Sequence, residues 1–345
     1  MTDAIREKCE LLALNRADIR KHFLFENSLM SIVAGLIFTS AGKEADIDKM
    51  KSCRKLLNRK TRLLSNLRDI VELALLSKMA LSDSPEQYLE DLISVYAKVQ
   101  KGKFLENDYM VMASIVILDH QLQNESDEIV SKANELMKRM NSDHPILTAV
   151  DDTSFIFFLA IAGKSVDTIL ADLEESYNYI TSTYKTTLGS DPVYELCEVL
   201  AVTFGDMKDK CDKVMRIYNS LVKTDFEYGT GSAFSALGAF AGIDVEPGFI
   251  AEEISSTEKY LKTMKGFSEP SVDKKTRIMC AAVIVADVYG SIPEAAGNSM
   301  ISNTLSLIWV KKISNMISVI SSVAPGLISA VLPEENKDKG SDPVN

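Results

Sequence analysis

Hydrophobic positions recur along this chain in units of about 41 residues. Equivalent positions lie late in amphipathic, helix-like stretches, and successive ones are separated by 40 to 42 residues. Each is followed by a turn and then by a short, almost wholly apolar run. A fixed period in this range is typical of stacked helix pairs. The equivalent positions are Leu14, Leu56, Tyr96, Met137, Tyr177, Tyr218 and Tyr260.

One unit shows the pattern most fully. Ser84 and Pro85 form a helix start, with a capping side chain followed by proline at the first helical position. Apolar residues then recur at spacings of three and four, which places them on one face of a helix. Lys101 and Gly102 end the helix, and a nearly all-apolar run begins at Val111. The apolar face consists of Leu89, Leu92, Ile93, Tyr96 and Val99.

Each unit thus predicts an amphipathic helix with one wet face, followed by a helix buried between its neighbours. We predict an all-α fold: a helical-repeat, α-solenoid-like stack of about seven antiparallel helix pairs with a period of about 41 residues. An irregular multi-helix bundle is the alternative. Residues 1–290 would form the repeat domain, 291–332 an apolar helical tail or cap, and 333–345 a disordered tail. The recurrent tyrosines are expected to pack between helices rather than to line a ligand groove.

The net charge and the cysteines indicate which partners and which cellular compartment are expected. The net charge of −11 argues against general nucleic-acid binding, because phosphates would repel the chain. The five cysteines are scattered and form no CxxC pair, which favours buried free thiols in a reducing compartment. The first residues are charged and lack an apolar signal core. We therefore expect a cytoplasmic protein, with any membrane association made through the C-terminal tail.

The tail breaks the repeat pattern. Residues 300–332 are rich in Ile, Ser, Val and Leu, and the part from Ile313 to Leu332 carries no charge. This length could span a bilayer, but its serines and the Pro325–Gly326 pair make it a poor spanning helix. We favour a cap that closes the helical stack. A tail that lies on a membrane surface or binds a partner is the second interpretation.

Few residues indicate chemistry. The chain has no HExxH, CxxC, GxxxxGK[ST], GxSxG or GxGxxG motif, so no metal or cofactor is predicted. The richest polar cluster is His144 with Asp151 and Asp152, which could bind a cation or serve as acid and base. The simpler interpretation is that Pro145 breaks one helix and an aspartate caps the next.

A basic run is the other candidate. Between Lys49 and Arg68 the chain carries only basic charges, against a net negative protein. The run could meet an acidic partner, a phosphate-bearing ligand or a membrane surface, although a solvated helix face would give the same pattern. Nucleic acid is not expected, because no aromatic residues are interleaved. The candidate binding residues are Arg54, Lys55, Arg59, Lys60 and Arg62.

The chain also resembles a bacterial family catalogued as a domain of unknown function, number 4003. The resemblance covers roughly residues 10–290 and rests on diffuse helical signatures. It implies an all-helical cytoplasmic protein and supplies no catalytic residues. The segments that carry it are SLMSIVAGLIFTSAGKEADIDKM, ALSDSPEQYLEDLISVYAKVQKGKF, NDYMVMASIVIL, HPILTAVDDTSFIFFLAIAG and TRIMCAAVIVADVYG.

Three functional hypotheses follow. The first is a non-catalytic helical-repeat scaffold that binds a protein or peptide along a concave face. The second is an enzyme or small-molecule sensor with a pocket near His144, Asp151 and Asp152. The third is a peripheral membrane protein held by the C-terminal tail. The sequence favours the first, and it leaves the partner and the oligomeric state open.

Overall fold

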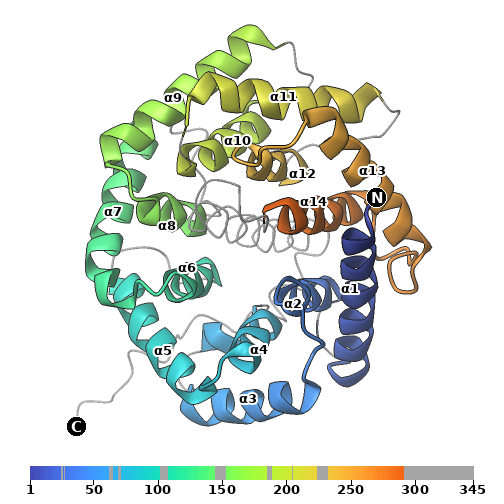
Figure 1. The fold of residues 1–345 in the computed structure, drawn as a ribbon. Coiled ribbons are helices and arrows are strands. Elements are labelled where there is room, and N and C mark those ends of the chain that lie inside the picture. Colours follow the sequence, from blue (N-terminus) through green and yellow to red (C-terminus); the bar gives the residue numbers. More distant parts are fainter. Residues whose placement is uncertain are drawn as a thin grey trace.

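The computed structural model shows an all-α protein in the part of the chain that it describes. Its helices alternate between an outer and an inner layer, and together they form a ring (Figure 1). The described residues are 1–24, 26, 28–61, 65–68, 71–101, 108–143, 153–184, 189–203, 205–223 and 232–290.

The outer layer consists of the odd-numbered helices, which follow the rim of the ring in chain order (Figure 1). Several begin at a side chain that accepts a hydrogen bond from the first turn, as Asp46 does from Lys49 N at 2.9 Å and Ser165 from Thr168 N at 3.1 Å. These helices are α1 (Asp3–His22), α3 (Ile47–Lys60), α5 (Pro85–Lys101), α7 (Ser126–Asp143), α9 (Val166–Thr183), α11 (Met207–Lys223) and α13 (Pro247–Thr263).

The inner layer consists of the apolar, even-numbered helices, which lie on the inner side of the ring (Figure 1). None of the helices in the described ranges has the length and apolar character needed to cross a membrane. Two short 3-10 turns, η1 (Ser65–Arg68) and η2 (Gln123–Glu125), lie in the connections. The inner elements are α2 (Ser28–Ser40), α4 (Glu72–Leu81), α6 (Asp108–Asp119), α8 (Thr153–Ile161), α10 (Ser190–Val202), α12 (Ser232–Ser235) with η4 (Ala236–Phe240), and α14 (Lys274–Gly290).

The predicted alternation of wet and buried helices is confirmed in these elements. The α5 helix begins at Pro85 and ends at Lys101, and it buries one face only. In contrast, every residue of α2 from Met30 to Thr39 is buried. Apolar residues on all sides of a helix require cover on all sides, so such a helix is stable only inside the array. The residues that α5 buries are Leu89, Leu92, Val95, Tyr96 and Val99.

Tyr177 and Tyr218 of the outer helices pack against the inner layer, as expected, whereas Tyr260 donates a hydrogen bond to Glu10 of α1 at 2.8 Å. Tyr96 is 1% exposed. The Tyr177 ring meets Tyr194 of α10 edge to face at 6.0 Å, and Tyr218 meets Phe234 of α12 in the same way at 5.1 Å. These rings fill the contact between the two layers, which confirms the packing interpretation.

One inner element differs from its prediction. The sequence pattern predicts a buried second helix in every unit, but the apolar run from Ala233 forms the short α12 and the 3-10 turn η4. Gly238 in this turn approaches α10 so closely that an added Cβ would lie 2.5 Å from Val199 Cγ1. At this point of the ring, α12 and η4 thus take the place of a regular inner helix and pack closely on α10.

The ring closes because α1 packs against the last helix pair. Besides its own partner α2, α1 contacts both α13 and α14 (Figure 1). Lys8 of α1 forms an ion pair with Asp287 of α14, a residue that is 5% exposed. Nearer the surface, Arg20 pairs with Glu269 at 2.6 Å.

Arg16 is the most deeply buried cation of this contact, at 2% exposed. Its guanidinium donates hydrogen bonds to the carbonyl of Gly266 and, at 3.3 Å, to Ser28 Oγ. It also lies over the Phe267 ring, 5.1 Å from the centroid. Gly266 has a φ of +92°, and a Cβ there would overlap the guanidinium. We call the contacts of α1 with α13, α14 and the loop 264–273 the closure seam.

The closure seam adds a contact that the sequence pattern does not predict. An open stack leaves its first and last units with one neighbour each and exposes a concave groove along its length. Here the first and last helix pairs are neighbours, so the ring encloses the inner side of the curve (Figure 1). The predicted binding along a concave face is not tested by these contacts and stays a prediction.

Candidate functional site

The predicted polar cluster cannot be placed. His144, Asp151 and Asp152 lie outside the described residues, and so does Arg62 of the basic run. The cation-site and acid–base hypotheses for this cluster therefore stay predictions.

The other two histidines are placed, and neither forms a site. His22 is exposed, with Nδ1 2.9 Å from the Asp18 carbonyl oxygen. His120 is half-buried, and its ring meets Phe158 edge to face at 5.9 Å. Burial lowers the pKa of His120, which favours a neutral imidazole at pH 7. Within the described ranges, no three His, Cys, Asp or Glu side chains gather where they could hold a metal ion.

The cysteines follow the prediction. All five thiols are free and buried. Burial raises the pKa of Cys9 and of Cys211 to about 12, so these thiols are protonated at neutral pH. A protonated, buried thiol is a poor nucleophile, and these residues serve the core.

Arg54 of the basic run joins neighbouring elements of the ring. It forms ion pairs with Glu26 at 2.5 Å and with Glu72 of α4 at 2.6 Å. Its guanidinium also lies over the Phe23 ring, 4.8 Å from the centroid. Burial raises the pKa of Glu72, and the charge of Arg54 opposes that shift. Arg54 therefore compensates a buried carboxylate and packs α3 against its neighbours.

Two lysines of the run also contact the adjacent helices. Lys60 at the end of α3 forms ion pairs with Glu86 at 2.9 Å and Glu90 at 2.6 Å, both on α5. Lys49 donates to the Ser82 carbonyl oxygen at 2.9 Å, just after the end of α4. Basic groups are favourable at this negative end of a helix. These contacts neutralise part of the positive charge that the sequence displays.

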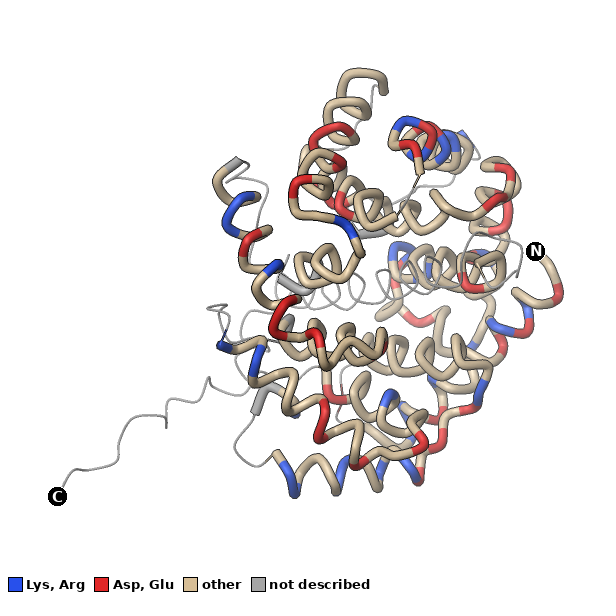
Figure 2. The backbone as a smooth tube through the Cα atoms, turned by 60° about the vertical axis from the view of Figure 1, so that its left-hand side comes forward, with Lys and Arg blue, Asp and Glu red and all other residues tan. Residues whose placement is uncertain are grey.

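The remaining basic residues of α3 form an exposed line. Lys51, Lys55 and Arg59 are four residues apart, so they share one face of the helix, and all three are exposed. Lys51 lies 4.0 Å from Asp48, whereas no described carboxylate is within ion-pair distance of Lys55 or Arg59. In Figure 2, basic positions recur along this helix at the lower edge of the molecule. We call these three residues the α3 basic stripe.

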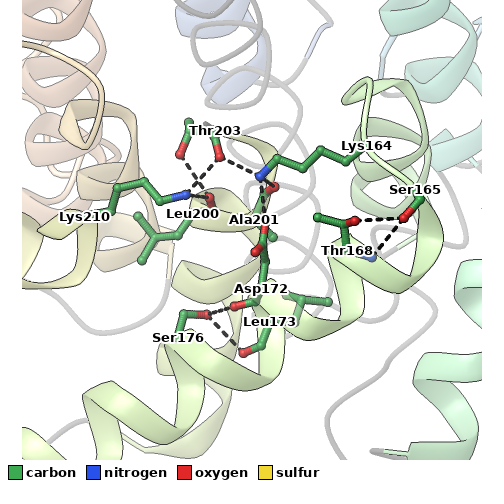
Figure 3. Close-up of polar contacts among 10 residues, drawn as sticks. All are labelled: Lys164, Ser165, Thr168, Asp172, Leu173, Ser176, Leu200, Ala201, Thr203 and Lys210. Atoms are coloured by element: carbon green, nitrogen blue, oxygen red, sulfur yellow. Dashed lines mark hydrogen bonds and ion pairs between the residues drawn. The ribbon is translucent and has the colours of Figure 1, made fainter. Parts of the chain in front are cut away.

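A second polar cluster, which sequence reasoning missed, lies at the C-terminal end of α10 (Figure 3). Lys164, in the loop before α9, donates to two carbonyl oxygens at 2.7 Å and pairs with Asp172 at 2.7 Å. Lys210 of α11 donates to two carbonyl oxygens at 2.8 and 2.9 Å. We call this group the α10 terminal cluster. The carbonyl acceptors are those of Leu200, Ala201 and Thr203, with Thr203 serving both lysines.

Lys210 has the most altered amine of this cluster. Burial, and then the charge of Lys164, lowers the pKa of Lys210 from 10.5 to about 8. A lysine with such a pKa can act as a nucleophile where a substrate reaches it. Lys210, however, is 4% exposed and directs its ammonium to the end of α10. The arrangement therefore fits a helix cap that joins α9, α10 and α11.

The sequence holds little that would reveal this cluster. Lys164 follows Gly163 at the end of an apolar run, and Lys210 lies on an amphipathic helix rich in other charges. From the amino-acid sequence alone, both lysines would be expected to be ordinary surface residues. Only the packing of α10 between α9 and α11 brings them to the same carbonyl groups.

A family model supports the resemblance found in the sequence. The model that matches is described as "Protein of unknown function (DUF4003)", and it covers residues 15–313. No curated protein and no solved structure matched the chain. Because the family model spans most of the sequence, the chain belongs to the DUF4003 family of proteins of unknown function.

Proposed function

We propose that this protein is a non-catalytic helical-repeat binding protein whose α3 basic stripe contacts an acidic protein or peptide. The observation that carries the proposal is which residues of the basic run have a carboxylate partner and which do not. Arg54 and Lys60 are paired with carboxylates, whereas Lys55 and Arg59 are exposed without one in the described part of the chain. Two such positive charges on a chain of net charge −11 favour a negatively charged partner.

We also infer that the helix pairs descend from one repeated unit, as in α-solenoids. The outer helices begin at recurrent intervals, and each one carries one of the equivalent positions of the 41-residue pattern. The ring would then be a solenoid whose curvature brings its ends together. Reduced cysteines and the absence of a disulfide among the five thiols support the further proposal of a cytoplasmic location.

The enzyme hypothesis has less support. Its predicted residues, His144, Asp151 and Asp152, are outside the described ranges, and Lys210 is occupied as a helix cap. The membrane hypothesis rests on the C-terminal tail, which is also outside those ranges. Neither has an observation in the described helices that favours it over binding at the α3 basic stripe.

The experiment that tests the proposal reverses the stripe. The variant Lys51→Glu/Lys55→Glu/Arg59→Glu should fail to capture a partner that the wild-type protein captures from native cells. With the purified partner, its Kd should be more than tenfold higher than that of the wild type. Raising the salt concentration should weaken wild-type binding, because the contact is electrostatic.

A charge-matched control is available on other outer helices. Lys21, Lys138 and Lys262 are exposed and belong to α1, α7 and α13. The variant Lys21→Glu/Lys138→Glu/Lys262→Glu changes the net charge equally but leaves the stripe intact, so it should keep the partner. If both variants bind the partner as the wild type does, the stripe is not the binding surface.

A further inference from the structure

The inner helices are buried on every side. In α2, all residues from Met30 to Thr39 are buried, and in α14 all residues from Arg277 to Asp287 are buried. A helix without an exposed face must be covered by outer helices, by inner neighbours and also on the side that faces the axis of the ring. The described helices account for the first two kinds of cover.

The orientation of α2 shows which residues face the axis. Gly35 faces α1, because a Cβ at this position would lie 3.2 Å from Arg16 N and 3.3 Å from Leu12 Cδ1. Val33 and Ile37 are two residues away in either direction, so they lie on the opposite side of the helix. The remaining flanks of α2 contact α4 and α14. Val33 and Ile37 are nevertheless 0% and 4% exposed.

General helix-packing distances indicate that the inner helices lie too far apart to cover one another across the axis. The inner layer has seven elements in the described part, counting α12 with η4 as one. Helices pack with about 8–10 Å between their axes, so seven of them in a circle span roughly 20 Å. Helices on opposite sides are then about twice the packing distance apart. The inward faces therefore need another occupant.

We propose that residues 300–332 of this chain dock lengthwise along the axis of the ring and cover the inward faces of the inner helices. The described chain leaves from Gly290, the end of inner helix α14. Residues 291–299 can reach about 30 Å, which exceeds the length of an inner helix. The other undescribed stretches are at most nine residues long, whereas this segment is long and carries only the charges of Lys311 and Lys312.

The serines of the segment fit such a place. Serine is costly to bury unless its hydroxyl finds an acceptor, and a helix supplies one in the carbonyl of the preceding turn. Buried serines of the inner layer form such hydrogen bonds. Ser31, Ser77 and Ser114 are buried in α2, α4 and α6, and their hydroxyls donate to carbonyls of their own helices at 2.6, 2.8 and 2.7 Å. The long stems of Lys311 and Lys312 allow their ammonium groups to reach an open end of the ring.

Trp309 provides the test, because it is the only tryptophan of the chain and lies in the proposed segment. In lipid-free, full-length protein its emission should be blue-shifted, and iodide should quench it several-fold less than it quenches the unfolded chain. This protection should not change with protein concentration. Proteolysis under native conditions should spare residues 300–332 until the helices unfold.

Two charge-matched variants separate docking from general effects. Ile313→Asp/Ile317→Asp/Ile320→Asp places three charges on one face of the segment, and it should expose Trp309 while the helical circular dichroism of the ring is kept. Asn336→Asp/Ser341→Asp/Asn345→Asp adds the same charge beyond the segment and should leave Trp309 protected. These two results support docking.

Three results would overturn the proposal. Trp309 could be quenched in lipid-free wild-type protein as readily as in the unfolded chain. It could become protected only when anionic phosphatidylserine vesicles are added, which would assign the segment to a membrane surface. Its protection could instead disappear on dilution, which would assign the cover to a second copy of the chain.

Discussion

The closure seam and the α10 terminal cluster both bury positive charge, but they compensate it differently. In the seam, Lys8 faces the carboxylate of Asp287, which lies 279 positions away in the sequence. In the cluster, Lys164 and Lys210 share the carbonyl end of α10, and Asp172 is the only carboxylate that pairs with them at ion-pair distance among the described residues. The seam joins the two ends of the ring, whereas the cluster joins consecutive helices.

This difference shows how one fold uses charge for two purposes. When one partner of a buried ion pair is removed, the other charge stays buried without compensation. Such a pair therefore stabilises only the contact between the two segments that carry its partners. Lysines on helix carbonyls satisfy the end of one helix, but burial, and then the charge of Lys164, lowers the pKa of Lys210. The seam should therefore respond mainly to the removal of a partner, and the cluster should respond mainly to pH.

The largest expected effect comes from breaking the seam pair. The variant Lys8→Met leaves the carboxylate of Asp287 buried without its cation, which should lower the free energy of unfolding by about 3 kcal/mol. Urea denaturation measures this loss. Adding Asp287→Asn in the same chain should recover most of it, because the buried charge is then gone. A loss below about 1 kcal/mol for Lys8→Met would mean that the pair behaves as an exposed one.

A smaller effect should distinguish the loops of the two regions. Gly266 in the seam and Gly163 beside Lys164 have φ values of +92° and +66°, which disfavour a side chain. At Gly163 an added Cβ meets nothing within 4 Å, so Gly163→Ala should cost about 1 kcal/mol from backbone strain alone. Gly266→Ala should cost about 2–3 kcal/mol, because its Cβ also displaces Arg16. Equal losses in thermal or urea unfolding would show that the Arg16 contact is not restrictive.

The smallest effect is the pH response of the cluster. Because the pKa of Lys210 is lowered to about 8, the unfolded chain holds this proton more tightly than the folded one between about pH 8 and 10.5. The contribution of Lys210 to stability therefore rises with pH in that window, by at most about 1.4 kcal/mol per pH unit. Between pH 7.5 and 9 the wild type should gain about 1 kcal/mol relative to Lys210→Met. A difference that does not change with pH would contradict the shifted pKa.

The helices themselves were predictable because they depend on local periodicity. The spacing from Leu89 to Val99 defines the buried face of α5, and the apolar run from Ser28 to Ser40 can only be an inner helix. Closure of the ring was not predictable. Lys8 and Arg16 lie among other charges on an amphipathic helix, and no local pattern links them to partners some 250 or more positions later.

The binding candidates show the same limit. The sequence shows that Arg54 and Lys60 belong to a run without acids, but it does not show the acids that α4 and α5 bring to them. Lys55 and Arg59 are exposed because they lie on the outward face of α3. Periodicity along one helix therefore predicts burial well, but it cannot predict which charges of neighbouring helices will meet.

The closed ring also changes how the protein can open. In a linear array the terminal units have one neighbour, and they fray first because only one interface holds them. Here α1 packs on both α2 and the α13–α14 pair, so the first and last pairs each have two neighbours. Local opening must then break two interfaces at once, wherever it begins. Amide protons of α1 and α14 should accordingly exchange as slowly as those in the middle of the chain, and unfolding should proceed as one cooperative event.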